Sequence, residues 1–440
     1  MKRRAFYWLL LPLLAANLFF GARVYLFSAQ AAPAKDNPYE NYKLLADVME
    51  KVRAEYVDGD KLSYQDLIHA ALKGMIGSLD PHSEFMEPTR FDNLKQQTEG
   101  EFGGIGIIVE MGGDKLLTVV TPMPDTPGYR AGILPGDKII KINDKSTEKL
   151  GLEDAVGLLR GEPGTKVSIT IHRPATGETK RYDLKRAVVK IPTVQDLNDK
   201  QEFPLGDHGI GYVRVNEFGE RTADDLHAAL EELQAKGMKA LILDLRNNPG
   251  GLLDQAEQVC ELFLKPGTSI VSTEGRGMTN IYRAHSRGRR MDLPMVVLVN
   301  SGSASAAEIV TGCLQDLQTQ THAIVVGEQT FGKGSVQSVL PLSDGSALKL
   351  TTAKYYTPSH KVIHERGITP DIFVPQSPEE EADLRLKHSP GAMESLDEKT
   401  RQRVANAHDR QLERAVDLLK GVLLYSQRNA PATKVAVAAP

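Results

Sequence analysis

A serine-rich segment, Asn300 to Glu308, is the first stretch whose residue types could do chemistry. It follows an apolar run, Met295 to Val299, and precedes an expected helix from about Ala306 to Leu317. A serine at such a turn has its hydroxyl near a helix N-terminus, where unpaired N–H groups and the helix dipole favour developing negative charge. Ser305 and Glu308 also have the spacing of a capping box, so these residues alone leave a purely structural role open.

Lys333 is the second candidate. It stands between Gly332 and Gly334, so neighbouring backbone can approach it closely. A lysine acts as a general base only when neutral, and lowering its pKa from about 10.4 to about 7 requires a bias of roughly 4 kcal/mol against the charged form. Burial in an apolar pocket can supply that bias, whereas the alternative is a solvated lysine in a turn. A phosphate-binding loop is excluded because Gly334 stands where that motif requires Ser or Thr.

The third candidate is the segment Asp244 to Gly251, which reads Asp-Leu-Arg-Asn-Asn-Pro-Gly-Gly. It ends an expected buried strand, Lys239 to Leu245, and opens an expected helix, Leu252 to Leu264. Two glycines at a helix N-terminus can present backbone N–H groups to an oxyanion. The same residues would also suit an ordinary Asn-Pro-Gly turn.

The elements that must position these segments alternate between strand and helix over about residues 188 to 375. Besides those already given, we expect a strand at Gly209 to Val215 and a helix at Thr222 to Lys236, with Thr222 as a plausible cap. Such alternation predicts a sheet covered by helices.

Residues 100 to 187 have a different texture, with short apolar runs separated by glycines. One short helix, about Leu152 to Leu159, interrupts them. This pattern predicts a small β-barrel. Its strands are expected at Ile105 to Val109, Leu116 to Val120, Lys138 to Ile142, Val167 to His172 and Thr179 to Leu184.

The terminal regions are predicted to be helical. Tyr39 to Leu94 has helical spacing, with a second helix from Tyr64 to Ile76. The region from 376 to 440 is expected to open with a charged linker, to continue as one helix from Asp397 to Tyr425, and to end in a tail. The helix carries an apolar stripe that must pack against its own domain or a second subunit.

Composition excludes several classes of protein. Of the 440 residues, 41% are hydrophobic and 25% are charged, which is ordinary for a folded globular chain. The net charge of −4 lacks the concentrated basic excess of a dedicated nucleic-acid binder. Two cysteines, Cys260 and Cys313, exclude a disulfide scaffold and a thiolate zinc site. We interpret both as core thiols and leave a mutual disulfide open.

The N-terminus predicts export. Lys2, Arg3 and Arg4 precede an apolar run from Ala5 to Phe20, the pattern of an export signal whose positive end stays inside. Ala29-Gln30-Ala31 would suit signal peptidase, and residues 5 to 29 are alternatively long enough to remain as a membrane anchor. We therefore expect the remaining chain to be periplasmic or anchored in the inner membrane.

Taken together, the motifs resemble those of the C-terminal processing, or tail-specific, proteases of the serine–lysine type. The resemblance covers about residues 40 to 375. One departure from it is Asp316 to Gly327, which is about three residues longer than in common members, so we expect an enlarged loop at Gln318 to Thr321. The matching motifs are Asp80-Pro81-His82-Ser83, Phe102-Gly103-Gly104-Ile105-Gly106, Ala131 to Asp137, Asp244 to Gly251, Ser303 to Glu308, Gly327-Glu328 and Phe331 to Gln337.

The resemblance implies a role for each site residue. Ser305, not Ser303, would be the nucleophile, Lys333 its general base, and Gln337 the residue that orients the lysine. The backbone N–H groups of Gly251 and Ala306 would form the oxyanion hole. No cofactor or metal is implied.

The β-rich region resembles a PDZ domain, which captures a terminal carboxylate on backbone N–H groups while the peptide adds as a strand. Gly103, Gly104, Ile105 and Gly106 would form the carboxylate-binding loop, and Ile105 and Ile107 would favour apolar C-termini. Arg160 would couple the PDZ domain to the active site, although an arginine before Gly161 is equally well explained as a helix C-cap.

The predicted fold is a multidomain α/β and β chain, with a PDZ β-barrel before a crotonase-like α/β protease core and helical terminal regions. The expected domains are residues 1–30, the signal peptide or anchor; 36–99, helical; 100–187, PDZ; 188–375, protease core; and 376–440, charged linker, helix and tail.

The predicted function is an envelope serine endopeptidase that selects C-terminal tails and cleaves through an acyl-enzyme. Expected partners are protein substrates with apolar C-termini, a regulatory or adaptor protein, the membrane and a second copy of the chain, but not nucleic acid. Two alternatives remain at this point: a PDZ scaffold on an inactive protease core, and an acyl-CoA enzyme, against which the export segment argues.

Overall fold

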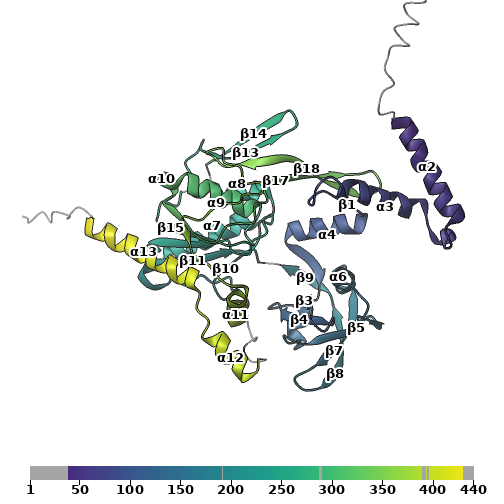
Figure 1. Ribbon diagram of the computed structural model, residues 1–440. Coiled ribbons are helices and arrows are strands. Elements are labelled where there is room, and N and C mark those ends of the chain that lie inside the picture. The colour runs from purple at the N-terminus through teal and green to yellow at the C-terminus, as the bar shows by residue number, and fades with distance from the viewer. Residues whose placement is uncertain (1–37, 191, 287–289, 389–392, 394–395, 430–440) are drawn as a thin grey trace, which may run out of the picture. The chain divides into compact units, whose positions relative to one another are not determined.

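The structure is a computed structural model that describes residues 38–429 except 191, 287–289, 389–392 and 394–395 (Figure 1). The chain divides into two units, one ending at Ser78 and the other beginning at Leu79. The expected export segment and the C-terminal tail lie outside the described residues. Within the described ranges, helices that combine the length and the apolar character needed to cross a membrane are absent.

The first unit contains the two helices that the sequence predicts. They are α2 (Pro38–Glu55) and α3 (Tyr64–Gly77), with a short 3-10 helix, η1 (Gly59–Lys61), between them. Ser63 begins α3 through a complete capping box, because its side chain accepts from the N–H of Asp66 and the Asp66 carboxylate accepts from the N–H of Ser63. These helices confirm the helical reading of this part of the chain.

An antiparallel sheet forms the small β-domain of the second unit. Its strand order is β3-β4-β5-β7-β8, with β6 paired to β5, so β3 lies at an edge. A compact apolar core that includes Ile105, Ile139 and Leu159 fills its interior. The elements are β3 (Ile107–Met111), β4 (Leu117–Pro122), α5 (Pro127–Arg130), β5 (Lys138–Ile142), β6 (Lys145–Ser146), α6 (Leu152–Leu159), β7 (Lys166–Arg173) and β8 (Glu178–Lys185).

The chain enters and leaves this domain through a two-stranded ribbon. After α4 (Pro88–Glu99), β2 (Glu101–Gly104) pairs antiparallel with β9 (Ala187–Lys190). The expected strand from Ile105 is therefore wrong at its start, because β2 ends at Gly104 and β3 begins at Ile107. Gly106 causes the break: its φ is 69°, and a Cβ there would lie 2.2 Å from the Cβ of Thr126.

A largely parallel sheet forms the protease core. The order is β10-β11-β12-β15-β16-β19, and only β10 runs antiparallel to its neighbour. The elements of this layer are β10 (Val194–Gln195), η2 (Asp207–Gly209), β11 (Ile210–Val215), α7 (Thr222–Ala235), β12 (Ala240–Asp244), α8 (Leu253–Glu261), β15 (Met295–Val299), α9 (Ala306–Asp316), α10 (Gln318–Thr321), β16 (Ala323–Gly327) and β19 (Ile372–Phe373).

Helices cover both faces of this sheet (Figure 1). Leu241 and Leu243 of β12 pack into the cluster that contains residues of α7, α8 and α9, whereas Ile242 packs with Ala415 and Leu419 of α13 (Arg410–Asn429). Successive residues of a strand point to opposite faces, so every residue of β12 is buried. The predicted α/β core is confirmed, and the apolar stripe of the C-terminal helix packs against its own domain.

A second, antiparallel sheet was not expected from the sequence. It has the order β1-β18-β13-β14, and β17 also pairs with β18. Its strands are β1 (Glu84–Met86), β13 (Ser269–Gly275), β14 (Met278–Arg283), β17 (Ser335–Pro341) and β18 (Ala347–Tyr356). The helical reading through Leu94 is therefore wrong at residues 84–86, where pairing of Glu84 with Lys349 overrides local spacing.

Three shorter expectations are also corrected. Gln318–Thr321 is a helical turn, not a loop. The charged linker contains α11 (Pro378–His388), because Ser377 and Glu380 form reciprocal capping bonds of 3.2 and 2.8 Å. The single expected C-terminal helix is two helices, α12 (Glu398–Ala405) and α13, and Asp409 accepts the N–H of Leu412 where α13 begins.

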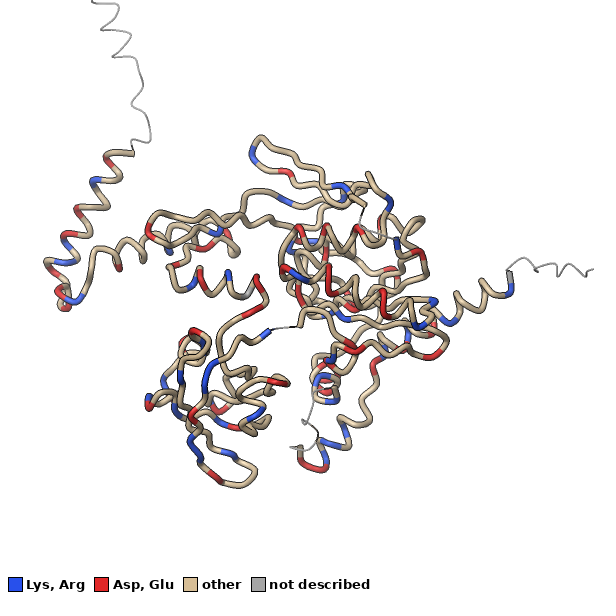
Figure 2. The backbone as a smooth tube through the Cα atoms, turned by 180° about the vertical axis from the view of Figure 1, so that it is seen from behind, with Lys and Arg blue, Asp and Glu red and all other residues tan. Residues whose placement is uncertain are grey.

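Acidic and basic residues are interspersed along the described chain (Figure 2).

Candidate active site

The carboxyl ends of β12 and β15 bring two of the candidate segments together. The strands are parallel neighbours, with Asp244 opposite Leu298, so the loops that follow them meet at one edge of the sheet. A Cβ placed on Gly250 would lie 2.7 Å from the Cβ of Ser305 and 2.9 Å from the amide nitrogen of Ala306. Only glycine therefore allows this loop to lie against Ser305.

Ser305 is held in a strained conformation at the start of α9. Its φ of 54° lies in the left-handed region, which is unfavourable for a serine and recurs at functional sites. The preceding Ala304 donates its N–H to the carbonyl of Asn248 at 2.9 Å, which fixes the turn against the glycine loop. Ser303, by contrast, is fully buried and donates its hydroxyl to the carbonyl of Leu245 at 2.8 Å, so it has a structural partner.

One buried carboxylate joins Ser305 to Lys333. A single oxygen of Glu308, Oε2, accepts the backbone N–H of Ser305 at 2.8 Å and that of Lys333 at 2.9 Å. Its Oε1 accepts the hydroxyl of Thr330 at 2.5 Å and the N–H of Gly332 at 2.7 Å. The spacing of Ser305 and Glu308 indicated only a helix cap, whereas the structure shows a bridge between two distant segments.

Lys333 lies where its charged form is disfavoured. Burial lowers its pKa, the positive charge of Lys349 lowers it further, and Glu308 partly opposes both effects. The neighbouring glycines permit this placement: a Cβ on Gly334 would lie 2.1 Å from the amide nitrogen of His364. The described hydrogen bonds do not include one between the Lys333 amine and the Ser305 hydroxyl, and the two residues are linked by the backbone bridge through Glu308.

Gln337 lies on β17, four residues after Lys333. Its amide nitrogen donates to the hydroxyl of Ser335 at 2.8 Å and to that of Thr351 at 3.3 Å. A bond from Gln337 to Lys333 is not among the described hydrogen bonds, and the orienting role of Gln337 stays a prediction.

The two expected oxyanion donors have unused N–H groups. Among the described backbone hydrogen bonds, neither Gly251 nor Ala306 is a donor. Gly251 has a φ of 143°, and a Cβ there would lie 2.3 Å from the carbonyl oxygen of Phe218. Ala306 is the first residue of α9, where the helix dipole adds to the positive potential of its N–H.

The residues expected to form the carboxylate-binding loop of the PDZ domain have different environments: some are paired in a strand, and one has its side chain in the domain core. Gly103 and Gly104 belong to β2 and are paired with Val188 and Ala187. The N–H groups of Ile105 and Gly106 lie outside the strands and do not donate in the described backbone bonds, while the side chain of Ile105 is in the domain core. The available carboxylate donors are therefore concentrated at residues 105 and 106.

The side chain of Arg160 contacts β2 and not the last carbonyls of α6. Its guanidinium lies over the ring of Phe102 at 4.4 Å, and burial lowers its pKa. The carbonyls of Leu158 and Leu159 are instead bound by the guanidinium of Arg186, at 2.8 and 3.0 Å. Arg160 is nevertheless the C-cap residue of α6, because its backbone N–H donates to the carbonyl of Val156 at 2.9 Å, so the C-cap interpretation is confirmed and Arg186 adds side-chain bonds to the last carbonyls.

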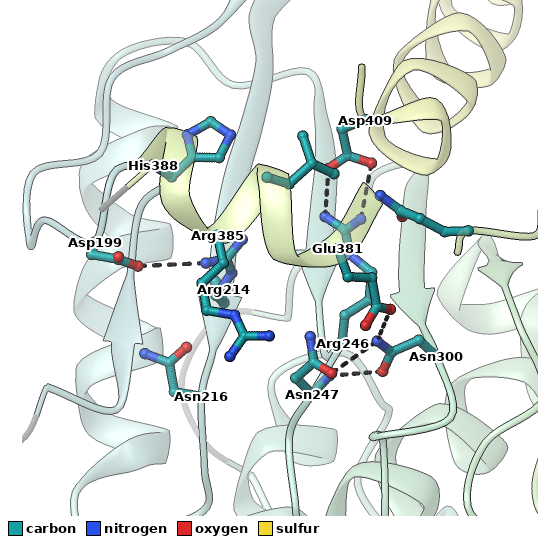
Figure 3. Close-up of a pocket in the computed structure, with 12 residues that line it drawn as sticks. Asp199, Arg214, Asn216, Arg246, Asn247, Asn300, Glu381, Arg385, His388 and Asp409 are labelled. Carbon is teal, nitrogen blue, oxygen red and sulfur yellow. Dashed lines mark hydrogen bonds and ion pairs between the residues drawn. The ribbon is translucent and has the colours of Figure 1, made fainter. Parts of the chain in front are cut away.

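A polar pocket of about 420 Å³ lies at the same edge of the sheet and is bordered by α11 (Figure 3). Asn300 donates to Asn247 at 3.0 Å and to Glu381 of α11 at 2.9 Å. Arg246 binds Asp244 at 2.7 Å and Asp409 at 2.9 Å. These contacts tie the C-terminal helices to the loop that leads to Gly250.

Among the described residues, one group could bring three metal ligands together: Glu257, Glu261 and His285, whose ligand atoms lie within 4.8 Å. Glu261 accepts from both the backbone and the ring of His285, which accounts for the arrangement without an ion. Cys260 and Cys313 are buried free thiols.

Comparison with known proteins decides the family. The pattern of Peptidase family S41 matches residues 209–374, and that of the PDZ domain matches residues 118–173. The chain is 44% identical over 374 residues to the carboxy-terminal-processing protease of Bartonella bacilliformis, and the match covers 82% of each protein. The chain belongs to the C-terminal processing proteases of family S41.

Two further relatives have similar descriptions. The protease is 35% identical over 362 residues to the carboxy-terminal processing protease CtpA of Bacillus subtilis, covering 81% of this chain and 73% of the relative. It is 30% identical to the solved photosystem II D1 C-terminal processing protease, with a TM-score of 0.45, covering 79% of this chain and 97% of that one.

The family resemblance and the predicted fold class are thus confirmed: a PDZ domain precedes an S41 α/β core, with helical segments at both ends. The protein is a serine-type C-terminal processing peptidase, and its PDZ domain implies protein substrates recognised by their C-termini.

Proposed function

We propose that the protease cleaves peptide bonds with Ser305 as nucleophile and Lys333 as general base, through an acyl-enzyme. The observation that carries this proposal is the buried Glu308 carboxylate, which holds the backbone of both residues while Gly250 packs against Ser305. A nucleophile, a base of lowered pKa and preorganised N–H donors are the parts that acyl transfer requires.

The acylation step follows from these parts. Neutral Lys333 takes the proton of the Ser305 hydroxyl as the oxygen attacks the carbonyl carbon of the substrate. The N–H groups of Gly251 and Ala306 stabilise the oxyanion that forms. The Lys333 ammonium then gives its proton to the departing amide nitrogen, the C–N bond breaks, and an ester to Ser305 remains.

Deacylation uses the same groups. Lys333, neutral again, takes a proton from water as the hydroxide equivalent attacks the ester carbonyl. Collapse of the second tetrahedral intermediate breaks the bond to the Ser305 oxygen, and the ammonium returns the proton to it. Gln337, four residues beyond Lys333, would orient the amine in both steps.

The PDZ domain would select apolar C-termini. Its β3 is an edge strand, and α6 lies next to it. A peptide can therefore add to β3 by main-chain hydrogen bonds, in the groove between β3 and α6. The N–H groups of Ile105 and Gly106 would receive the terminal carboxylate, and Ile107 would contribute an apolar wall. Arg160, stacked on Phe102 of β2, would transmit occupancy of this groove to the connecting ribbon.

We further propose that the protease acts outside the cytoplasm, in the periplasm or on the inner membrane. The basic and apolar N-terminal sequence supports this location. Assembly with a second copy and regulation by an adaptor protein belong to the same proposal, and exposed Tyr39, Tyr42 and Leu44 on α2 support the former.

The test compares four forms of the full chain: wild type, Ser305→Ala, Lys333→Ala and the control Ser301→Ala, an exposed neighbour. Each is incubated with an unfolded protein ending in Val-Ala-Ala and with the same protein ending in Asp-Asp. We expect wild type and Ser301→Ala to cleave the apolar-tailed substrate preferentially and the other two to be inactive. Cleavage by Ser305→Ala would refute the nucleophile, and tail binding without any cleavage would favour an inactive scaffold.

A further inference from the structure

The Asp80-Pro81-His82-Ser83 motif lies beside the active site, although the chemistry described above does not use it. Asp80 Oδ1 accepts the N–H groups of His82 and Ser83, both at 2.8 Å, and Oδ2 accepts the Ser83 hydroxyl at 2.7 Å. Burial lowers the pKa of His82, and the charge of Lys333 lowers it further, which places this loop within electrostatic range of the lysine.

A chain of hydrogen bonds leads from Asp80 to Gln337. The hydroxyl of Thr351 donates to Asp80 Oδ1 at 3.2 Å, and the Gln337 amide nitrogen donates to the same hydroxyl at 3.3 Å. Thr351 on β18 and Gln337 on β17 are direct neighbours in the sheet, so strand pairing fixes their separation. Ser83 secures the other side, because its hydroxyl accepts the N–H of Thr351 at 3.1 Å.

The negative charge of Asp80 determines which group donates and which accepts in each of these hydrogen bonds. An ionised carboxylate only accepts hydrogen bonds, so the single proton of the Thr351 hydroxyl must point toward Asp80. The Thr351 oxygen can then only accept from Gln337, which fixes the amide with its nitrogen toward Thr351. Although burial alone would raise the pKa of Asp80, the hydrogen bonds from Ser83, His82 and Thr351 outweigh it and lower that pKa, so the carboxylate is ionised at neutral pH.

This orientation leaves one group of Gln337 available. Both amide hydrogens are used, one on Ser335 and one on Thr351. The carbonyl oxygen is the remaining polar atom of the side chain, and an acceptor is what a lysine amine requires from a residue that orients it. Reversal of the amide would present a donor instead.

We propose that Asp80, acting through Thr351, is a positioning residue that fixes the Gln337 amide with its carbonyl oxygen available to Lys333. The inference rests on the proposed Ser305–Lys333 chemistry and deepens it. It makes the Asp80 loop and Thr351 of the second sheet part of the machinery that orients Lys333.

The test is a kinetic double-mutant cycle in the full chain, with cleavage of the apolar-tailed substrate as readout. Thr351→Val removes the hydroxyl at nearly constant shape, Thr351→Ser restores it, and Gln337→Ala removes the residue to be oriented. Thr352→Val is the matched control, because the neighbouring hydroxyl bonds only to Ser338 among the described contacts and is exposed.

We expect Thr351→Val to lower kcat about tenfold, the usual effect of losing one hydrogen bond, with KM unchanged. Thr351→Ser should recover most of this loss, and Thr352→Val should behave as wild type. In the Gln337→Ala background, Thr351→Val should cause no further loss, because effects on one pathway are not additive. A purely structural role would give effects that multiply.

Wild-type kcat in Thr351→Val, or a loss that multiplies with that of Gln337→Ala, would overturn the proposal. Melting temperatures are measured for every variant, and if Thr351→Val does not fold, Asp80→Asn takes its place in the same cycle with the same expectation. Ser305→Ala separates the two hypotheses. If Ser305→Ala cleaves the substrate, the proposed function is refuted. If Ser305→Ala is inactive but the effects of Thr351→Val and Gln337→Ala on kcat multiply, only the positioning role of Asp80 and Thr351 is refuted.

Discussion

Lys333 illustrates the conflict between chemistry and stability at the scale of a residue. In the proposed mechanism the active form of this lysine is neutral, and the protein favours that form by burying the amine near Lys349, with Glu308 opposing. The unfolded chain imposes no such bias. Between the lowered folded pKa and the ordinary value, the unfolded state binds more protons, so this residue makes stability rise with pH.

Lys333→Met should therefore abolish cleavage while raising the free energy of unfolding at pH 7, because methionine carries no charge that the folded state disfavours. The gain should shrink as the pH rises above the lowered pKa of the folded protein, because the folded amine is then neutral and the remaining difference falls to zero as the pH passes the ordinary value of about 10.4. Urea unfolding at pH 7 and pH 10, compared with the exposed control Lys354→Met, measures it. An equal gain at both pH values would show that packing, not charge, is responsible.

Which residues could be predicted depended on whether their partners were near in sequence. Ser305 and Lys333 were identified through motifs, and the structure brings them to one carboxylate. The bridging role of Glu308 was missed because its second set of partners, Thr330 to Lys333, lies more than twenty residues away. Asp80 was recognised as part of a motif, but its link to Thr351 spans most of the chain.

At the scale of elements, the loop that carries Gly250 and Gly251 depends on the C-terminal helices. Arg246 precedes this loop and is held between Asp244 and Asp409, with all three side chains largely buried. Burial would raise the pKa of Asp244, but Arg246 and Arg214 lower it to about 2. The stability that Asp244 contributes is present above its ordinary pKa and is lost as the pH falls toward 2.

Asp409→Ala should lower the free energy of unfolding by about 2 kcal/mol, because two charge-assisted hydrogen bonds to Arg246 and the capping bond from the N–H of Leu412 are lost while Asp244 still neutralises Arg246. Urea unfolding followed by circular dichroism measures the change. Asp417→Ala, at an exposed position of α13, is the control and should have little effect. Equal losses in the two variants would mean that helix propensity, not the ion pair, determines the result.

Element prediction succeeded where local signals were complete. The fully apolar runs gave β12 and β15, and α6 was predicted at its observed bounds. In the second sheet, β1 was missed because it pairs with β18 across more than 250 residues, a contact with no local pattern, whereas the hairpins β13–β14 and β17–β18 are local pairings that were overlooked. The helix α11 was misread as a charged linker although Ser377 and Glu380 signalled its start.

At the scale of the whole molecule, the PDZ domain, which we propose selects the tail, and the protease core, which we propose cleaves the bond, have separate hydrophobic cores. Ile139 belongs to the core of the PDZ domain, whereas Leu243 belongs to the core that supports the Ser305 loop. A change in one core should therefore affect one activity first. Two variants of similar severity can test this separation.

Ile139→Ala should destabilise the PDZ domain by about 2–5 kcal/mol, since Ile139 is fully buried. We expect preference for apolar over acidic tails to disappear while Ser305 still reacts with a small fluorophosphonate, because its backbone supports all lie outside the PDZ domain. Leu243→Ala should do the reverse and slow the labelling of Ser305. If Ile139→Ala abolished labelling as well, an intact PDZ domain would be required to assemble the catalytic residues, and the ribbon of β2 and β9, where Arg160 stacks on Phe102, would be the connection to mutate next.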